Sequence, residues 1–211
     1  MINNIRRKRK PRKAIVTDVD HWRDAINNKN DQALINLILK AEKRSALEKE
    51  IKSTGDAFYI AFIKSNKKLY DHLMQFGVNP NELMGSINVY SYNQNYNKQT
   101  ALSYMLSMLS RSENDENMLQ VFFKCWPLKK LLNDGFNATP EKINPIDWPL
   151  STIISYNDYD SVRLILDNKC SHQFKEGVLE QALSSPKIYQ YLLEKGFRPS
   201  NNSSYWKDFF D

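Results

Sequence analysis

The stretch Leu73-Met74-Gln75-Phe76-Gly77-Val78-Asn79-Pro80-Asn81 decides the predicted fold, because it joins the end of an amphipathic helix to the turn that stops it. The glycine supplies the positive φ of an αL C-cap, the next apolar residue packs back on the last helical turn, and the proline blocks continuation. The same order recurs in Leu131-Leu132-Asn133-Asp134-Gly135-Phe136-Asn137 and in Leu192-Leu193-Glu194-Lys195-Gly196-Phe197-Arg198-Pro199-Ser200. Since the chain has only six glycines, three of them in one context indicate a repeated helix end.

Each of these helix ends is predicted to close a pair of short amphipathic helices. Val162, Ile165 and Leu166, for example, follow the i, i+3, i+4 spacing of a helix face. Pro127 is expected to kink or split the helical stretch 118–132. A shorter helix is predicted before each closing helix, over Ala57–Ile63, Thr100–Leu109, Leu150–Ser155 and Val178–Leu183. Because two helices about ten residues long cannot bury their apolar faces alone, the pairs are expected to stack as a solenoid.

This pattern resembles the ankyrin repeat, which runs Thr-Pro-Leu-His-x-Ala, a turn, a Leu-Leu helix and Gly-Ala-Asp-Pro-Asn. The copy from Ala61 to Asn81 follows it without a gap, and so does the copy from Pro149 to Cys170, which has Ser151 in the histidine position. At the end of this second copy, Leu164 to Ser171 is a fourth version of the helix end in which Lys169 stands where the glycine would be, so either Asn168 takes the turn or the helix ends differently. The resemblance implies an all-α, ankyrin-like solenoid of about five stacked helix pairs with little or no strand.

The predicted organisation is a basic, disordered tail over 1–13 and a single repeat domain over 14–211. Copies are expected near 18–50, 55–84, 99–137, 147–172 and 176–211, and the aromatic stretch from Tyr205 to Phe210 is expected to close the last one.

Composition excludes a membrane span and locates the charge of the chain. The longest apolar run, 57–63, has seven residues, whereas a bilayer needs about 20. Seven of the 30 basic residues lie in the tail, which has no acid: Arg6, Arg7, Lys8, Arg9, Lys10, Arg12 and Lys13. The remaining 23 basic and 24 acidic residues give the body a net charge of −1. The tail is therefore interpreted as a solubilising end, as a nonspecific nucleic-acid arm or as a nuclear-targeting segment. Two cysteines and the lack of an apolar stretch that would make a signal peptide predict an intracellular, cytoplasmic protein, with delivery into a host cell or nucleus as the alternative.

Catalytic and metal motifs are scarce. The stretch from Ala14 to Asp20 resembles the first motif of haloacid-dehalogenase-type phosphatases, with Asp18 as the nucleophile and Asp20 as the acid. The competing interpretation is that one of the two aspartates caps a helix. Three scattered histidines form no metal motif. The sequence thus predicts no enzyme activity, no cofactor and no metal.

The segment 85–99 is the strongest candidate for binding, since it is uncharged up to Asn97 and rich in Tyr, Asn and Ser, a composition typical of binding loops. In an ankyrin-like stack it would project as a finger between two repeats; the alternative is an insertion that is merely tolerated in a surface loop. The predicted partner-binding residues are Tyr90, Tyr92, Asn93, Tyr96, Trp148, Tyr156 and Tyr159, with a core position as the alternative for the tryptophan.

These features predict a protein-interaction module that is monomeric when alone and binds another protein through fingers and inner helices. An immunity-type inhibitor of a bacterial toxin is one concrete form, and a secreted bacterial effector that engages host proteins is another. A phosphatase and a nucleic-acid-associated protein are the alternatives from other functional classes.

Overall fold

The computed structural model describes residues 16–41, 44–85, 99–110, 118–140, 148–167 and 177–199. This part of the chain forms eleven α-helices and one 3₁₀ helix. The only β contact among the described residues is an isolated antiparallel bridge between Leu83 and Thr100. The all-α prediction is confirmed for these ranges. The basic tail, the C-terminal stretch 200–211 and the turn at Asn168 and Lys169 lie outside them.

The helices follow the predicted positions closely. Their bounds are α1 (Asp18–Asn27), α2 (Asp31–Ala41), α3 (Ser45–Ile51), α4 (Asp56–Ile63), α5 (Lys67–Gln75), α6 (Ala101–Ser110), α7 (Met118–Cys125), α8 (Leu128–Asn133), α9 (Pro149–Ser155), α10 (Tyr159–Asp167), η3 (Leu179–Ala182) and α11 (Pro186–Glu194). The expected split at Pro127 separates α7 from α8. Two details differ from the predictions. The sequence patterns did not reveal α3, and the segment 178–183 forms a 3₁₀ helix where an α-helix was expected.

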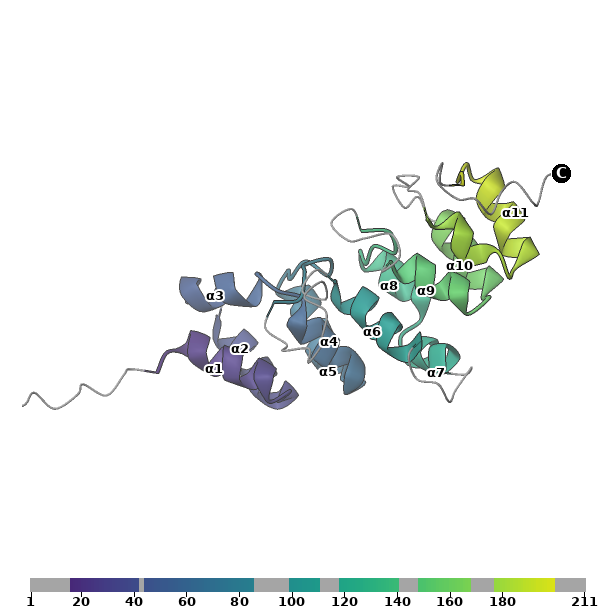
Figure 1. The fold of residues 1–211 in the computed structure, drawn as a ribbon. Helices are drawn as coiled ribbons and strands as arrows, with labels where there is room; N and C mark the ends of the chain where they lie inside the picture. Colours follow the sequence, from purple (N-terminus) through teal and green to yellow (C-terminus); the bar gives the residue numbers. More distant parts are fainter. Residues whose placement is uncertain are drawn as a thin grey trace, which may run out of the picture.

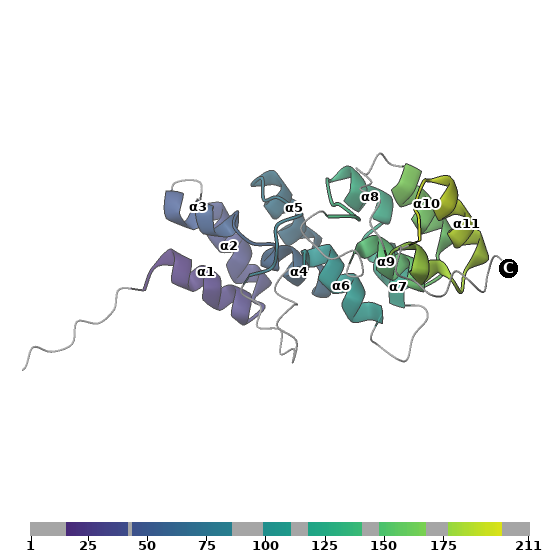
Figure 2. The ribbon, with the colours of Figure 1, turned by 45° about the horizontal axis from the view of Figure 1, so that its top comes forward.

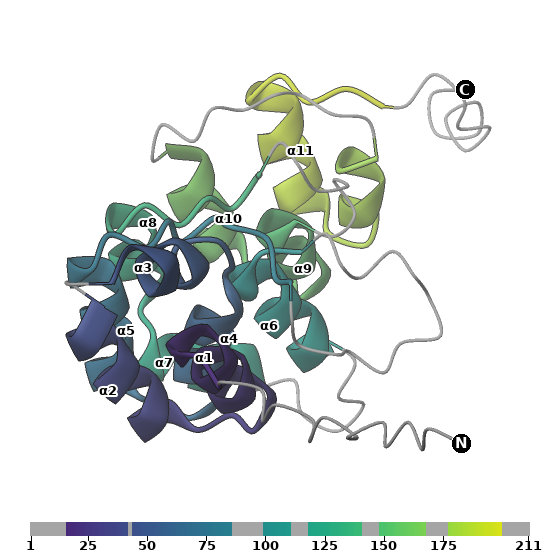
Figure 3. The ribbon, with the colours of Figure 1, turned by 90° about the vertical axis from the view of Figure 1, so that its left-hand side faces the viewer.

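Helix pairs lie one after another along the molecule in chain order (Figures 1 and 2). Within the pairs, α1 packs on α2, α4 on α5, α9 on α10 and η3 on α11. Between the pairs, the first helix of each pair contacts the first helix of the next pair: α1 contacts α4, α4 contacts α6, α6 contacts α9, and α9 contacts η3. Among the second helices of the pairs, α2 contacts α5, and α10 contacts both α8 and α11. Viewed from the α1 end, α2, α5 and α8 lie on one side of α1, α4, α6 and α9 (Figure 3).

The three glycine turns that decided the prediction are present and share one geometry. Gly77, Gly135 and Gly196 have φ of 77°, 94° and 93°. In each turn the glycine N–H and the next N–H donate back to the last helical turn, as in Gly77 N to Met74 O at 3.0 Å and Val78 N to Leu73 O at 3.1 Å. This is the Schellman arrangement, in which the apolar residue after the glycine contacts the helix it ends. Val78, Phe136 and Phe197 are accordingly buried.

A second repeated turn joins the two helices within a pair. Asn30, Asn66 and Asp158 each accept, on their side-chain oxygen, the N–H three residues later, at 2.9–3.1 Å. The residue before each of them has a positive φ of 50–56°, and the N–H of each donates back to the preceding helix. An asparagine or aspartate N-cap satisfies an otherwise unpaired helix N–H. The same cap therefore occurs at the same place in three of the pairs.

Helix α4 lies at the centre of the core. Its residues from Asp56 to Phe62 are all buried, because α1, α2, α5 and α6 pack around it. A helix that is apolar on every side is stable only in such a position. Phe58 and Phe62 lead into an aromatic cluster that joins the second and third pairs through Tyr70, Trp126 and Phe136.

Candidate partner-binding surface

The predicted finger is described only at its two ends. Tyr90, Tyr92, Asn93 and Tyr96 lie in 86–98, outside the described residues. The residues just before and after this segment are held close together: Met84 N–H donates to Gln99 O at 2.9 Å, and Leu83 pairs with Thr100. The chain therefore leaves and returns at one place beside α4 and α6.

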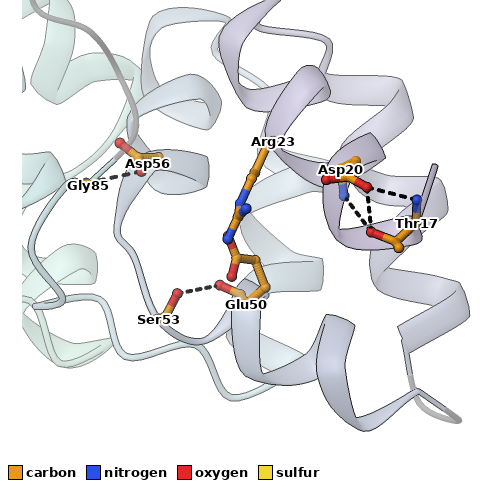
Figure 4. A network of polar contacts seen from close by, with 7 residues as sticks. All are labelled: Thr17, Asp20, Arg23, Glu50, Ser53, Asp56 and Gly85. Carbon is orange, nitrogen blue, oxygen red and sulfur yellow. Dashed lines mark hydrogen bonds and ion pairs between the residues drawn. The ribbon is translucent and has the colours of Figure 1, made fainter. Parts of the chain in front are cut away.

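A buried aspartate anchors the place where the chain leaves. Asp56, the first residue of α4, has no exposed surface, and its Oδ2 accepts the N–H of Gly85 at 3.1 Å (Figure 4). The preceding residue adds a second link, since Gly55 N–H donates to Leu83 O at 3.1 Å. A carboxylate acceptor makes a stronger hydrogen bond than a neutral one. The segment 82–85 is thus fixed to the N-terminus of α4.

Close packing at this anchor requires glycine. A Cβ added at Gly55 would lie 2.5 Å from the carbonyl oxygen of Glu82, and one added at Gly85 would lie 3.0 Å from the Thr54 Cγ2. The first contact is with backbone, so the chain could relieve it only by moving the segment away from α4. These two glycines let the backbone before the finger approach the helix.

The three aromatic residues predicted beside the finger, Trp148, Tyr156 and Tyr159, differ in burial. The prediction that Trp148 contacts a partner is wrong, because its side chain is only 1% exposed. Its indole N–H donates to the carbonyl oxygen of Pro140 at 3.1 Å, and the residue is the N-cap of α9. The alternative core position is therefore correct. Tyr156 and Tyr159 are half-buried at the turn between α9 and α10 and keep part of their surface open.

Tyr159 belongs to a network that joins α10 to α11. Its ring meets the ring of Tyr191 edge-on, with centroids 5.5 Å apart, and lies 3.7 Å from the Nζ of Lys187. The Tyr191 hydroxyl donates to Asp167 at 2.8 Å, and Lys195 pairs with the same carboxylate at 2.6 Å. The hydrogen bond from Lys195, followed by that from Tyr191, lowers the pKa of Asp167 to about 2. This network links successive helix pairs, so its groups already have partners within the chain.

Asp18 and Asp20 are structural in this arrangement. Thr17 is the N-cap of α1, and Asp20 closes a capping box with it: the carboxylate accepts the Thr17 N–H at 2.8 Å (Figure 4). Asp18, the first helical residue, pairs with Arg44. The prediction that one of the two aspartates is itself the N-cap is wrong, although the capping interpretation of the motif holds. Ala14 and Ile15, which the phosphatase interpretation takes as part of a strand, lie outside the described residues.

Other potential sites among the described residues are few. They contain no group of three or more His, Cys, Asp or Glu side chains placed to hold a metal ion. An open groove of about 460 Å³ runs between α1 and α2, with Ala25, Ala33 and Leu37 beneath a polar rim. The described helices are also all too short or too polar to cross a bilayer. The basic residues Arg6 to Lys13 lie outside the described ranges.

Two important positions escaped the sequence analysis. Asp56 was left outside the predicted helix Ala57–Ile63, and no pattern in the sequence indicated that its carboxylate is buried and accepts the N–H of Gly85. The hydrogen bond from the Tyr70 hydroxyl to Asp134 joins residues 64 positions apart, and no local pattern in the sequence indicates it.

Comparison with known proteins gives no further assignment. No protein family, no curated protein and no solved structure matches this chain.

Proposed function

We propose that the chain is an ankyrin-type helical repeat protein that binds another protein through the segment 86–98 and the neighbouring helices. Two kinds of turn, each with the same hydrogen bonds in three of the pairs, support the repeat assignment, and so does the row of contacts between first helices. Such stacks present loops and helix faces over a long surface, and many of them serve in recognition.

The observation that carries the binding proposal is the anchored base of the finger. A long segment between two helices is normally tolerated as a surface loop, without special attachment. Here its ends are joined to each other and to a buried aspartate, through Gly85 on Asp56 and Met84 on Gln99. Fixing the ends of a binding loop lowers the entropy lost when a partner orders it. The Tyr, Asn and Ser side chains between these ends supply adaptable contacts.

The favoured form of this function is inhibition of a partner enzyme, as by an immunity protein of a bacterial toxin. In a secreted effector, the alternative form, the same surface would engage host proteins and the tail 1–13 would act as an address. Neither form requires catalysis, a cofactor or a metal.

A capture experiment tests the proposal. The intact chain and a variant with Tyr90, Tyr92 and Tyr96 changed to Ala are immobilised and exposed to native lysate, and each captured protein is purified and titrated against both. A third chain with Leu39→Ala, on the exposed side of α2, serves as the control for an unrelated surface change. We expect the partner to bind the intact and control chains alike and the triple variant much more weakly. A partner that binds all three equally would exclude the finger as its docking site.

The alternatives from other classes have their own tests. Hydrolysis of a phosphate ester that disappears in Asp18→Asn would establish the phosphatase and overturn the binding proposal. Retention on heparin that disappears on removal of residues 1–13 would identify the tail as the polyanion site, whereas retention that persists would place such a site on the folded body.

A further inference from the structure

The turns inside the helix pairs can be compared position by position, because three of them have the same hydrogen bonds. Lys29, Ser65 and Asn157 take the same place: each has a positive φ of 50–56°, and each N–H donates to the carbonyl oxygen three residues earlier. The equivalent stretches are therefore 28–32 in the first pair, 64–68 in the second and 156–160 in the fourth. The first stretch has one lysine and one aspartate, the fourth has two aspartates, and the second has three lysines and no acid.

The first two turns are bonded to each other, which brings their lysines together. The side-chain amide of Asn66 donates to the Oδ2 of Asp31 at 2.6 Å, and α2 packs on α5. One lysine directly follows Asn66 in the chain, and another lies two residues before Asp31. We call the lysines of these two turns the lysine patch, and all four are exposed: Lys29, Lys64, Lys67 and Lys68.

The fold does not neutralise the charges of the lysine patch. Six other basic residues form ion pairs, as Lys52 does with Glu48, whereas no member of the patch does so within the described residues. The positions themselves are unfavourable for lysine. Lys67 and Lys68 are the first two residues of α5, where the helix dipole disfavours a positive charge, and Lys29 has a left-handed φ of 50°. Strained residues that the fold does not require are typical of functional sites.

Carboxylates limit the size of the patch. Asp31 lies inside it, but its two oxygens already accept the side-chain amide of Asn66 and the N–H of Gln32, and the patch with Asp31 included has a net charge of +3. Asp71 lies one turn further along α5, Asp24 lies on α1 five residues before the lysine of the first turn, and both are exposed. A long polyanion such as a nucleic acid would meet these carboxylates as well as the lysines, whereas a short acidic segment fits between them.

The lysine patch lies within reach of a partner that is held by the finger. Asp56, which anchors the start of the finger, is the first residue of α4, and Lys64 is the C-cap of the same helix. The eight residues of α4 separate these two ends by about 12 Å. We infer that the lysine patch is a docking surface for a short acidic segment of the partner protein. This inference rests on the proposed function and names the chemistry of a second contact with the same partner.

The structure also indicates what such a contact would do. Exposed charges on a binding surface act mainly on the rate of association and on the choice of partner. The dipole that disfavours the lysines at the start of α5 adds to their attraction for a carboxylate. The acidic segment would therefore steer the partner toward the second helix pair, while the finger supplies the contacts of uncharged side chains.

Carbodiimide coupling to an acidic peptide tests the inference without knowledge of the natural partner. The probe is a peptide of about ten residues with several glutamates among glycines and serines, and its control has glutamine in place of every glutamate. Carbodiimide condenses a carboxylate with the lysine amine that it touches into an amide and takes up the released water to form a urea. Mass spectrometry of the digested chain then identifies each coupled lysine, and those of the tail 1–13 are counted separately.

Two triple variants of the full chain carry equal changes of charge. The patch variant is Lys64→Gln, Lys67→Gln and Lys68→Gln. The control variant removes exposed lysines from α3, α7 and α8 that form no ion pair among the described residues: Lys49→Gln, Lys124→Gln and Lys129→Gln. Both variants keep the tail and Lys29, so the yield of coupling at Lys29 reports on the patch alone.

We expect coupling at Lys29 to fall at least about fivefold in the patch variant and to stay within about twofold of the intact chain in the control variant. The patch variant should also be at least as stable in urea as the intact chain, because it removes two positive charges from the start of α5. Equal coupling at Lys29 in the two variants would overturn the inference. A patch variant less stable than the control variant would overturn it too, because the fold would then need these lysines.

Two further measurements exclude other occupants. The turn of the third pair, 111–117, lies outside the described residues, and a variant neutralises its acids: Glu113→Gln, Asp115→Asn and Glu116→Gln. Coupling at Lys29 should be unchanged in that variant, and a several-fold rise would show that the chain covers the patch itself and would overturn the inference. Single-stranded DNA of equal charge should compete with the probe no better than a second acidic peptide. Stronger competition by DNA would assign the patch to a nucleic acid.

The inference and the proposed function fail separately. The capture experiment with the Tyr90, Tyr92 and Tyr96 variant decides the proposed function and does not depend on the lysines. A captured partner that requires the finger but binds the patch variant as tightly as the control variant would overturn the inference alone. A captured partner that binds the finger variant as tightly as the intact chain, with coupling at Lys29 still dependent on the patch, would refute the role of the finger alone.

Discussion

Tyr70 and Asp134 provide the sharpest test of the way in which successive helix pairs are joined. The Tyr70 side chain is 1% exposed, and its hydroxyl donates to Asp134 at the end of α8. Burial, and then this carboxylate, raises the pKa of Tyr70 well above its ordinary value, so the hydroxyl stays protonated. Asp134 also pairs with Lys130 and keeps 24% of its side-chain surface, so it retains partners if the tyrosine hydroxyl is removed.

The two single variants therefore lower the free energy of unfolding for different reasons. Tyr70→Phe removes a hydrogen bond to a charged acceptor and should lower the free energy of unfolding by about 1.5–3 kcal/mol. Asp134→Ala leaves a buried hydroxyl without its acceptor, at about 1–3 kcal/mol, and removes the surface pair with Lys130, at about 0.5 kcal/mol. In the double variant the hydroxyl is absent, so its desolvation penalty disappears. We expect a coupling energy of about 1–2 kcal/mol between the two positions.

Urea unfolding of the four proteins, followed by circular dichroism at constant pH, measures this cycle. Tyr191→Phe is a matched control, because it removes the same atom from a hydrogen bond to an aspartate, Asp167, in an exposed setting. That change should cost no more than about 0.5 kcal/mol. Additive effects of Tyr70→Phe and Asp134→Ala, within about 0.5 kcal/mol, would refute a direct bond between the pairs. An equal cost for Tyr191→Phe and Tyr70→Phe would refute the role assigned to burial.

The remaining predictions concern the anchor, one glycine turn and acid stability. Gly55→Ala should cost about 1–3 kcal/mol in urea unfolding, because its Cβ would meet the Glu82 carbonyl oxygen at 2.5 Å, and an unchanged stability would contradict that contact. A Cβ added at Gly77 would meet no atom within 4 Å, but the residue would keep a φ of 77°, so Gly77→Ala should lower the free energy of unfolding by about 1–2 kcal/mol through backbone strain. Gly77→Asn should lower it less, because asparagine tolerates the αL conformation. The pKa of Asp167 is lowered from 3.8 to about 2, so its contribution to stability is present above pH 4 and is lost as the pH falls toward 2. Acid unfolding of Asp167→Asn should lack that part of the pH dependence, and identical profiles for the variant and the intact chain would show that the ion pair is not formed.

The sequence could predict the features that depend on local backbone chemistry. A positive φ at Gly77, Gly135 and Gly196 follows from glycine in the context of a helix end, and the break between α7 and α8 follows from Pro127. Helix faces were predictable for the same reason, since the 3.6-residue period appears along the chain itself. These predictions need only neighbouring residues, so one sequence was sufficient for them.

The candidate binding surface was predictable only in part. Composition singled out the segment that contains Tyr90, Tyr92 and Tyr96, and these residues remain predictions because they lie outside the described ranges. The assignment of Trp148 to that surface was wrong, since an aromatic residue at a helix start looks the same in sequence whether it faces solvent or the core. The lysine patch was not singled out, because its two turns meet only when the first two helix pairs pack on each other.

The amino-acid sequence by itself determined where most of the helices begin and end, α3 excepted, because torsional preferences and caps act within a few residues. Only the tertiary structure decided which distant groups meet: Asp56 with Gly85, Tyr70 with Asp134, and Ser185 with Asn157. These contacts arise when neighbouring pairs cover one another's apolar faces, and that packing sets which side chains are buried.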